Sequence, residues 1–255
     1  MSVTIDLKGR TALVTGASSG LGRHFAGVLA QAGARVALAA RRTDALAETR
    51  AAIEAVGGSA TIVAMDVTDP DSVAAAVGEA WQALGRIDIL VNNAGVTATR
   101  PFLDMGEEEW EGVIDTNLTG CARVARAVAR RMREDGQGGA IVNIASILGM
   151  RVAGHVSSYI AAKAGLLHLT KAMALELARH DIRVNALCPG YVETELNADF
   201  FASDAGKALV KRIPQRRLGR LQDLDMPLLL LASDAGAYMT GSVLAVDGGH
   251  LVSSL

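Results

Sequence analysis

Tyr159 and Lys163 stand four positions apart in this sequence and are suited to moving a proton. They fall at the start of a long helical pattern, and residues at positions i and i+4 share one face of a helix. An ammonium group beside a phenol favours the ionised phenolate, which suits the tyrosine to general acid/base chemistry. The other tyrosines, Tyr191 and Tyr238, lack a lysine at this spacing. Because an isolated pair of this kind is more often a chance pair on a helix surface, its context must decide.

Three polar positions supply that context. Ser146 follows the predicted strand Ala140–Ala145 at its carboxyl end, where open α/β sheets bind ligands. Its hydroxyl could hold a carbonyl oxygen, or it could cap the next element. Asn117 falls inside a predicted helix, where asparagine is unfavourable, so a packing or functional reason is indicated. The segment Asn92–Gly95 closes the fourth predicted strand at the same edge, and an ordinary polar turn is its alternative.

A glycine-rich segment, Thr15–Gly22, joins the first predicted strand to a helix with the spacing Gly-x-x-x-Gly-x-Gly. Glycines let the backbone turn tightly and approach a pyrophosphate, and a helix start offers unpaired N–H groups and a partial positive charge. The spacing differs from the usual Gly-x-Gly-x-x-Gly fingerprint, and a turn without a ligand is the alternative. Its place at the first strand–helix junction favours a dinucleotide. The candidate contacts are Gly16, Ser18, Ser19, Gly20, Leu21 and Gly22.

The end of the second predicted strand indicates which dinucleotide binds. A site for NAD places an acid there for the ribose 2′-hydroxyl, whereas a site for NADP places a cation near the 2′-phosphate. Here Ala40 stands where the acid is expected, and Arg41 and Arg42 follow it. Two cations at a helix start oppose the helix dipole, so a bound phosphate explains them better than solvated surface charge does. We therefore predict NADP(H) in preference to NAD(H).

Short apolar runs alternate with helical patterns and predict the frame that positions these residues. Most runs are continuously apolar, as in parallel strands covered on both faces, and the alternation indicates a doubly wound parallel sheet of the α/β class. The predicted strands are Thr11–Thr15, Arg35–Ala40, Ala60–Met65, Ile87–Val91, Ala140–Ala145, Arg183–Leu187 and Val243–Val246. The predicted helices span 20–33, 43–56, 70–84, 107–135, 156–179 and 221–232.

Length and composition exclude several classes of protein. The 255 residues fit one α/β domain over 1–255, and 50% hydrophobic residues supply its core. A net charge of −2 offers no basic surface to nucleic acid. Cys121 and Cys188 provide neither a disulfide framework nor metal-ligand spacing, so we expect no metal and a reducing, cytoplasmic location. With no signal peptide and no apolar run of roughly 18 residues, no membrane association is expected.

The segment 190–220 is the one long stretch without a clear pattern. A long insertion after a late strand of this fold can form a lid over the ligand, and an ordinary pair of surface helices is the alternative. The side chains expected around the substrate are mostly apolar and carry no fixed charge, which suits a ketone or secondary alcohol with hydrophobic substituents. They are Leu148, Val152, Val156, Tyr191, Phe200 and Phe201.

Taken in order, these residues resemble the short-chain dehydrogenase/reductase family in its single-domain form. The resemblance spans almost the whole chain, and no catalytic position departs from the family pattern. It rests on Thr15–Gly22, Asp66, Asn92–Gly95, Asn117, Ser146, Tyr159 with Lys163, and Pro189-Gly190 with Thr194. The resemblance implies a three-layer Rossmann-like fold with about seven strands and helices on both faces. It also implies a homotetramer, or else a homodimer.

The resemblance further implies a role for each site residue. Tyr159 gives or takes the substrate proton, and Ser146 holds the substrate oxygen. Lys163 favours the phenolate of Tyr159 and binds the nicotinamide ribose, while Asn117 anchors a water that links Lys163 to solvent. The remaining implied cofactor contacts are Asp66 and Val67 beside the adenine, Asn93, Ala94 and Gly95 along the cofactor, and Pro189, Gly190, Val192 and Thr194 at its nicotinamide end.

The expected activity is therefore the NADP(H)-dependent interconversion of a small-molecule ketone and a secondary alcohol. Within the family, the sequence looks most like 3-oxoacyl-carrier-protein reductases and bacterial carbonyl reductases. A dehydrogenase of a sugar, polyol or steroid is the alternative enzyme, and a dinucleotide-binding sensor is the alternative without catalysis. A sensor predicts damage to Ser146, Tyr159 or Lys163, and none is visible.

Overall fold

The computed structural model describes residues 5–194 and 198–253, in which seven parallel strands form one sheet. The strand order is β3-β2-β1-β4-β5-β6-β7, so the order reverses between β1 and β4. The strands are β1 (Thr11–Thr15), β2 (Arg35–Ala40), β3 (Ser59–Ala64), β4 (Ile89–Asn92), β5 (Gly139–Ile144), β6 (Ile182–Pro189) and β7 (Val243–Val246). The predicted sheet is confirmed, with ends of β3, β4, β5 and β6 that differ by one or two residues from the expected ones.

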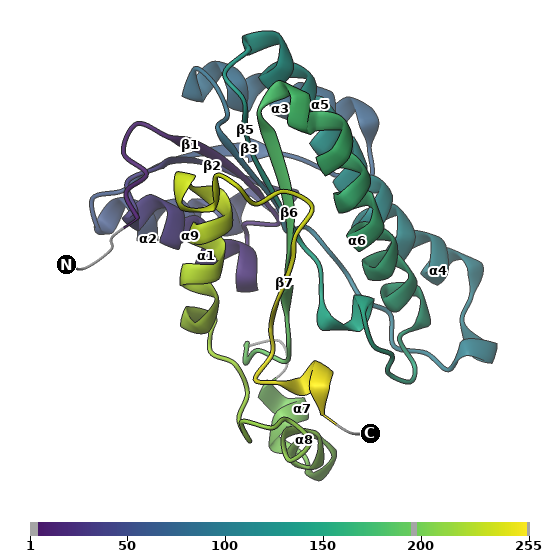
Figure 1. The fold of residues 1–255 in the computed structure, drawn as a ribbon. Helices are drawn as coiled ribbons and strands as arrows, with labels where there is room; N and C mark the ends of the chain where they lie inside the picture. The colour runs from purple at the N-terminus through teal and green to yellow at the C-terminus, as the bar shows by residue number, and fades with distance from the viewer. Residues whose placement is uncertain (1–4, 195–197, 254–255) are drawn as a thin grey trace.

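Helices cover both faces of the sheet (Figure 1). One face carries α1 (Gly20–Gln31), α2 (Thr43–Ala55) and α9 (Asp225–Ala232), and the other carries α3 (Pro70–Leu84), α5 (Cys121–Asp135) and α6 (Ser157–Leu177). Short 3-10 turns accompany them: η1 (Phe102–Asp104), η3 (Ile147–Gly149), η4 (Ala178–His180), η5 (Leu221–Leu224), η6 (Asp234–Gly236) and η7 (His250–Val252). This layering confirms the three-layer Rossmann-like fold. Within the described residues, no helix is long and apolar enough to cross a membrane.

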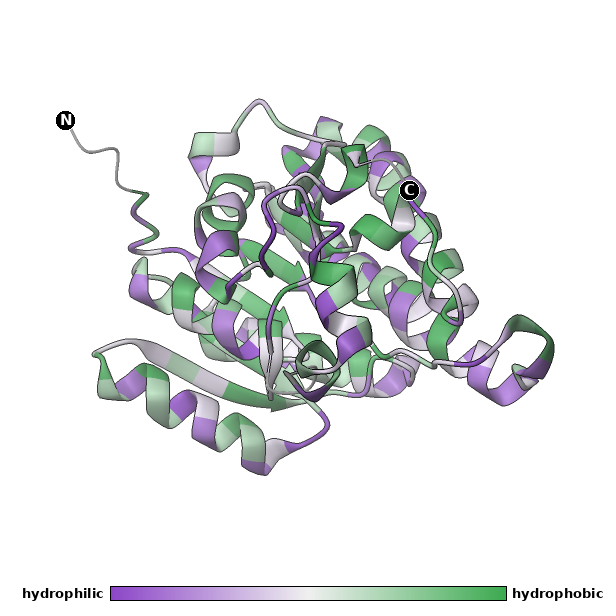
Figure 2. Cartoon of the chain, turned by 90° about the horizontal axis from the view of Figure 1, so that it is seen from below, coloured by the Kyte–Doolittle hydropathy of each residue, from purple (hydrophilic) through white to green (hydrophobic). Residues whose placement is uncertain are grey.

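The burial of the strands explains why their sequences lack an alternating pattern. Strands β1 and β4 are buried along their whole length, because helices cover both of their faces. Figure 2 shows largely hydrophobic strands in the interior and helices whose residues alternate between hydrophilic and hydrophobic. Helix α3 also has a clear local start signal, since Asp69 accepts the N–H of Asp71 at 2.9 Å and Pro70 is the first helical residue.

The helical stretch predicted over 107–135 contains a π-helical segment. Helix α4 (Glu107–Ile114) runs into the π segment η2 (Asp115–Gly120), and α5 follows it without a break. Asn117 lies in this segment and is fully buried. The unfavourable asparagine thus coincides with a wider turn, and such single-turn π segments occur frequently at functional sites.

In its described part, the segment 190–220 contains two short helices, α7 (Ala198–Ala202) and α8 (Asp204–Val210). They lie beyond the carboxyl ends of β6 and β7, close to the C-terminal segment (Figure 1). The hydroxyl of Ser203 caps α8 by accepting the N–H of Gly206 at 3.2 Å. These helices therefore stand at the same edge of the sheet as the predicted site.

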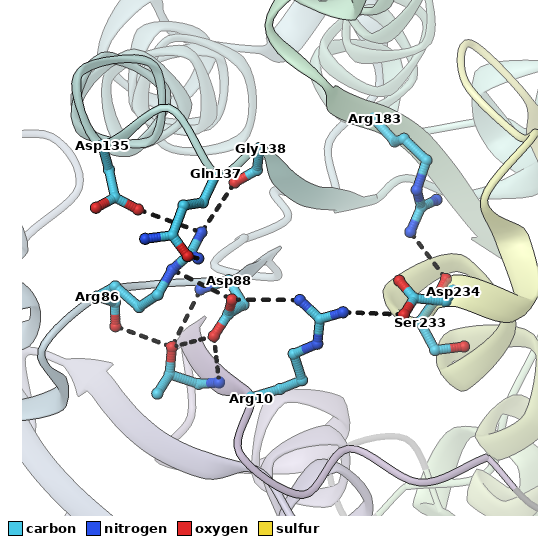
Figure 3. Close-up of polar contacts among 10 residues, drawn as sticks. Arg10, Arg86, Asp88, Asp135, Gln137, Gly138, Arg183, Ser233 and Asp234 are labelled. Atoms are coloured by element: carbon cyan, nitrogen blue, oxygen red, sulfur yellow. Dashed lines mark hydrogen bonds and ion pairs between the residues drawn. The ribbon is translucent and has the colours of Figure 1, made fainter.

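The opposite edge, where the strands begin, carries a network of ion pairs (Figure 3). The buried carboxylate of Asp88 accepts hydrogen bonds from the N–H and the hydroxyl of Thr11 at 2.8 and 2.7 Å. Its other oxygen lies 3.2 Å from Nε of Arg86 and 3.6 Å from Nη1 of Arg10. Arg86 also donates to the carbonyl oxygen of Gly138 at 3.1 Å. The network thereby joins the starts of β1, β4 and β5.

Two arginines extend this network to the end of α9 (Figure 3). Nη2 of Arg10 lies 2.9 Å from Oδ2 of Asp234, whose side chain is mostly exposed. Nη2 of Arg183, at the start of β6, donates to the carbonyl oxygen of Ser233 at 3.0 Å. One ion pair and one hydrogen bond from an arginine to the main chain therefore bind this helix layer to the amino edge of the sheet.

Candidate active site

A cavity of about 610 Å³ opens at the carboxyl edge of the sheet. Loops that follow β1, β2, β3 and β4 line it together with the start of α6, beside the reversal of strand order, where open α/β sheets bind their ligands. The predicted site residues that line it are Gly16, Ser18, Ser19, Gly20, Leu21, Arg41, Arg42, Asp66, Val67, Asn93, Ala94, Gly95, Tyr159, Lys163 and Thr194. The structure thus brings most of the predicted cofactor contacts together.

Some predicted residues lie outside this lining, and some lining residues were not predicted. Gly22, Pro189, Gly190 and Val192 do not line the cavity. A Cβ on Gly190 would lie 2.7 Å from Cα of Asp247, so close packing explains the glycine at this position. The additional lining residues are Ala39, Ala40, Met65, Thr68, Val96, Thr97, Thr116, Ile144 and Ala145. Most of these flank the carboxyl end of a predicted strand, and that position is the signal that could have identified them.

The glycine-rich loop is shaped by a close approach between its two ends. A Cβ on Gly22 would lie 2.2 Å from the carbonyl oxygen of Gly16 and 2.5 Å from Nδ2 of Asn93, so only glycine fits. Gly16 itself has φ +66°, which glycine adopts without strain. Ser19 precedes α1 and makes no side-chain capping bond. The first N–H groups of α1 therefore have no side-chain cap from Ser19 and suit a bound pyrophosphate.

Thr15 joins this loop to the segment that follows β4, a function that the sequence analysis did not assign to it. Its buried hydroxyl oxygen accepts the N–H groups of Asn93 and Ala94, each at 3.0 Å. The Asn93 side chain in turn donates to the carbonyl oxygen of Thr15 at 3.0 Å. A polar residue at the end of an otherwise apolar strand was the available signal. These bonds fix two walls of the cavity relative to each other.

The two arginines after β2 reach the cavity in different ways. Nη2 of Arg42 donates to the hydroxyls of Ser18 and Ser19 at 3.2 and 3.1 Å, so Arg42 reaches across to the glycine-rich loop. Arg41 is largely exposed, and its Nη1 lies 3.9 Å from Oδ2 of Asp66. A guanidinium held beside serine hydroxyls at the mouth of a cavity can bind a phosphate group.

Asp66 follows β3 and is held in one orientation by its neighbour. Oδ1 accepts the hydroxyl of Thr68 at 2.7 Å and the N–H of Thr68 at 3.0 Å. These bonds, with a smaller contribution from the charge of Arg41, lower the pKa of the Asp66 carboxyl below its ordinary value. Asp66 therefore remains an oriented hydrogen-bond acceptor at neutral pH.

Tyr159 and Lys163 lie in the first turns of α6, and both line the cavity. Nζ of Lys163 lies 5.5 Å from the centre of the Tyr159 ring, which confirms that the pair shares one helix face. Lys163 is 3% exposed, and its ammonium donates to the carbonyl oxygen of Ile144 at 2.8 Å. That bond to the end of β5 fixes the ammonium, whose remaining N–H donors are available to other partners.

Asn117 is bound to the chain that follows β4. Its Oδ1 accepts the N–H of Val96 and its Nδ2 donates to the carbonyl oxygen of Val96, each at 2.8 Å. A Cβ on Gly95 would lie 3.4 Å from Oδ1 of Asn117 and 3.7 Å from Nζ of Lys163. The π segment, the loop after β4 and α6 therefore converge at this point.

Ser146 stands between β5 and η3, directly after two residues that line the cavity. Its Oγ accepts the N–H of Leu148 at 3.1 Å, so it caps η3 as the alternative interpretation anticipated. The hydroxyl hydrogen is still available to a ligand oxygen. Ser146 itself is not part of the cavity lining in the described chain.

The predicted substrate residues separate into two groups. Tyr191 packs against Phe201 with ring centres 5.9 Å apart, and Phe201 packs against Phe200 at 5.1 Å. Leu148 and Val156 are half-buried, whereas Val152 is 76% exposed. The aromatic residues thus form one cluster, and Val152 lies away from it on the surface.

The chain is similar over nearly its whole length to known proteins. A family model described as enoyl-(acyl carrier protein) reductase matches residues 16–250. The L-rhamnose 1-dehydrogenase (NAD(P)(+)) of Azotobacter vinelandii is 40% identical, over 96% of this chain and 97% of the relative. The 3-oxoacyl-[acyl-carrier-protein] reductase of Thermotoga maritima is 37% identical, over 96% of this chain and 99% of the relative.

Solved structures agree with these relatives. A short-chain type dehydrogenase/reductase from Mycobacterium marinum is 45% identical with a TM-score of 0.92, covering 97% of each chain. A gluconate 5-dehydrogenase from Burkholderia cenocepacia, in complex with NADP and tartrate, is 36% identical with a TM-score of 0.94, covering 98% of each chain. Identity at this level over whole chains identifies a common family.

Proposed function

The chain belongs to the short-chain dehydrogenase/reductase family of oxidoreductases, and we propose that it uses NADP(H) to interconvert a ketone and a secondary alcohol. One observation carries this proposal: Tyr159 and a buried Lys163 share a helix face at the wall of a cavity whose far end is a glycine-rich loop. The relatives' names support it, since they are dehydrogenases and reductases of alcohol and carbonyl groups.

The residues of the cavity fit a dinucleotide. The tight loop that excludes a Cβ at Gly22 and the uncapped start of α1 suit a pyrophosphate. The oriented carboxylate of Asp66 suits the adenosine end of the molecule. The nicotinamide, when bound, supplies or accepts the hydride. Of the cofactor contacts that the sequence predicts, those at Gly22, Pro189, Gly190 and Val192 have the least support, because these residues lie outside the lining.

The chain's own residues then handle the proton. Tyr159 gives a proton to the substrate oxygen in reduction and takes it back in oxidation. Ser146 donates its free hydroxyl hydrogen to that oxygen and stabilises developing negative charge. Lys163, fixed by Ile144, supplies positive charge beside the phenol, and Asn117 holds the loop of Gly95 against it.

NADP(H) is proposed over NAD(H) because two arginines lie at the mouth of the cavity. Arg42 is already directed at the glycine-rich loop by Ser18 and Ser19, and Arg41 stands beside Asp66. A 2′-phosphate would replace the neutral hydroxyl acceptors of Arg42 with anionic oxygens, so that both donor and acceptor would be charged. The solved relative from Burkholderia cenocepacia with bound NADP supports this choice.

A spectrophotometric assay tests the proposed function. NADPH oxidation is followed with an uncharged activated ketone, and NADP⁺ reduction with the matching alcohol. Turnover in both directions, with a lower Michaelis constant for NADPH than for NADH, is expected. Tight binding of NADPH without any turnover of carbonyls or alcohols would instead favour the dinucleotide-binding sensor.

The substrate divides the relatives into two groups. A carbonyl or 3-oxoacyl reductase is one candidate, and the aromatic cluster of Tyr191, Phe200 and Phe201 supports it. A sugar or sugar-acid dehydrogenase is the second, and it is favoured by relatives named for L-rhamnose and gluconate. The segment 190–220, as a lid of one domain spanning 1–255, would select between them.

A homotetramer, or else a homodimer, is proposed from the surface of α5 and α6. A groove of about 550 Å³ runs between these helices, and Leu175 on α6 is 83% exposed beside it. Apolar side chains on a helix pair favour packing against a second pair. Light scattering after size-exclusion chromatography measures the mass.

A cytoplasmic location is proposed because Cys121 and Cys188 are free and buried.

A further inference from the structure

A polar cluster lies next to the aromatic residues, at the carboxyl ends of β5, β6 and β7. It consists of Arg151, which follows η3, Tyr191, which follows β6, and His250, which begins η7 after β7. The rings of Tyr191 and His250 have centres 5.5 Å apart. Nη1 of Arg151 donates to the carbonyl oxygen of His250 and lies 3.5 Å from Oγ of Ser253. We call Arg151 and His250 the Arg151–His250 pair.

Arg151 has unused hydrogen-bonding capacity. Both of its hydrogen bonds to described residues use the single nitrogen Nη1. A guanidinium carries five N–H donors in a planar fork, so Nε and Nη2 have no hydrogen-bond partner among residues 5–194 and 198–253. Arg151 is half-buried, and a partly desolvated guanidinium with a free edge suits a carboxylate ligand.

His250 has an unused buried atom. Its side chain is 5% exposed, and its Nδ1 has no hydrogen-bond partner in the described chain. Nearly all buried polar atoms in proteins are hydrogen-bonded, so an orphaned ring nitrogen beside Tyr191 calls for a ligand or a water. A hydroxyl group on a substrate would satisfy it.

Packing places Arg151 near the helix that carries Tyr159: Arg151 comes two residues after η3, and η3 packs against α6. Burial raises the pKa of the Tyr191 phenol, the charge of Arg151 opposes the rise, and Tyr159 adds to it. Burial lowers the pKa of His250, as do Arg151 and Arg212, whereas Asp247 opposes them. His250 is therefore a neutral hydrogen-bonding group near pH 7.

The charge around the pair is positive. Arg151 and Arg212 both act on His250, and Asp247 is the acid that faces it. The carboxylate oxygens of Asp247 already accept the N–H groups of Gly249 and Leu251, at 2.9 and 2.7 Å. Asp247 is thus occupied by the chain's own backbone, and an incoming anion would meet Arg151 with its free N–H groups.

We propose that the Arg151–His250 pair selects substrates in which the reacting carbon chain carries a carboxylate next to a hydroxyl, with Arg151 binding the carboxylate and His250 the hydroxyl. The proposal rests on the proposed function, because it places this pair beside the substrate of Tyr159. The substrate class is therefore a 2-hydroxy acid that carries a further ketone or secondary alcohol, which reacts at Tyr159. It departs from the apolar, uncharged wall that the sequence predicts, because Arg151 and His250 lie outside the predicted set.

Competition against an uncharged ketone tests the proposal without knowledge of the natural substrate. Lactate and lactamide have the same shape and a hydroxyl, and only lactate carries a charge. Each is titrated into the NADPH-dependent reduction of an uncharged activated ketone by the full-length enzyme. We expect lactate to compete with the ketone, not with NADPH, and to have an inhibition constant about tenfold or more below that of lactamide, as for a charge-assisted hydrogen bond.

Variants of the pair separate substrate recognition from support of the C-terminal segment. Arg151→Gln should remove the advantage of lactate over lactamide, and Arg151→Lys should keep part of it. Arg50→Gln, which removes an exposed arginine on α2, should keep all of it. If Arg151→Gln weakens both competitors in equal proportion, Arg151 only supports the C-terminal segment and the proposal is wrong.

The same assay distinguishes failure of the proposed carboxylate subsite from failure of the proposed oxidoreductase function. Reduction of the ketone with no competition by lactate, or with competition against NADPH alone, overturns the carboxylate subsite and leaves the oxidoreductase intact. Absence of any ketone turnover in the wild-type enzyme overturns the proposed function instead. His250→Phe keeps a ring against Tyr191 and removes Nδ1, so it should weaken lactate and lactamide alike; unchanged inhibition constants would exclude His250 from the subsite.

Discussion

The two edges of the sheet use charged and polar residues in opposite ways. At the amino edge, charges pair with one another: Asp88 with Arg10 and Arg86 (Figure 3). At the carboxyl edge, Lys163 and Asn117 are each bound to a main-chain group. The buried carboxylate of Asp88 is occupied by Thr11, Arg10 and Arg86, and it joins the starts of two strands. Lys163 is oriented by one main-chain oxygen and keeps further N–H donors for a ligand. We expect the first arrangement to serve stability and the second to serve the proposed chemistry.

Tyr159→Phe, at the carboxyl edge, tests this separation and should have the largest effect. The substitution removes the proton donor and keeps the ring, so turnover should fall at least ~100-fold, the usual contribution of general acid catalysis. The midpoint of thermal unfolding and the affinity for NADPH, measured by fluorescence titration, should change little. Tyr238→Phe is the matched control, because Tyr238 is fully exposed. If Tyr159→Phe keeps its turnover, Tyr159 is not the proton donor, and the proposed catalytic function of the carboxyl edge is contradicted.

Asp88→Asn applies the same test to the amino edge. It leaves Arg86 without its buried counter-charge, and breaking such a pair costs about 3 kcal/mol of unfolding free energy. Urea denaturation measures this loss, and kcat/KM under native conditions should stay within about twofold, since no substrate group is within reach. A large loss of kcat/KM in fully folded protein would show that the two edges are coupled.

Arg42→Gln refines the comparison, because it removes a charge whose expected partner is the 2′-phosphate of NADP(H). Loss of a charge-assisted bond to the 2′-phosphate should raise the Michaelis constant for NADPH about tenfold and leave that for NADH almost unchanged. The free energy of unfolding should change little, since Arg42 itself is exposed and only its bond to Ser18 is partly buried. Equal effects on the two cofactors would contradict the assignment of Arg42 to the phosphate.

Asp234→Asn should have the smallest effect, although it belongs to the same network as Asp88. Its carboxylate pairs with Arg10 at 2.9 Å, but the side chain is largely exposed, and such pairs contribute less than about 1 kcal/mol. Chemical denaturation of the two asparagine variants side by side compares a buried and an exposed member of one network. Equal losses would mean that burial does not set the strength of these pairs.

The sequence predicts the sheet and the shared helix face of Tyr159 and Lys163 well because both depend on local rules. Parallel strands buried on two faces are apolar throughout, and a spacing of four residues places Tyr159 and Lys163 on one helix face. The glycine-rich loop is equally predictable, since Gly22 faces a contact that admits no Cβ.

What the sequence does not predict depends on contacts between distant segments. In the sequence, Thr15 is only the last residue of a strand. Its function becomes visible when the fold places the N–H groups of Asn93 and Ala94 against its hydroxyl. Arg151 and His250 are 99 positions apart, and only the neighbouring strands β5, β6 and β7 bring them together. Val152 is 76% exposed, and its expected contact with the substrate stays a prediction.

The π segment at Asp115–Gly120 has a consequence for the history of the site. A π turn amounts to one residue inserted into an α-helix, and each α-helical residue turns the chain by about 100°. Deleting one residue within the segment would restore a regular helix and rotate Asn117 relative to α5, away from Val96. Loss of a single codon in this segment would therefore move Asn117 out of its present position and leave the rest of the fold in place.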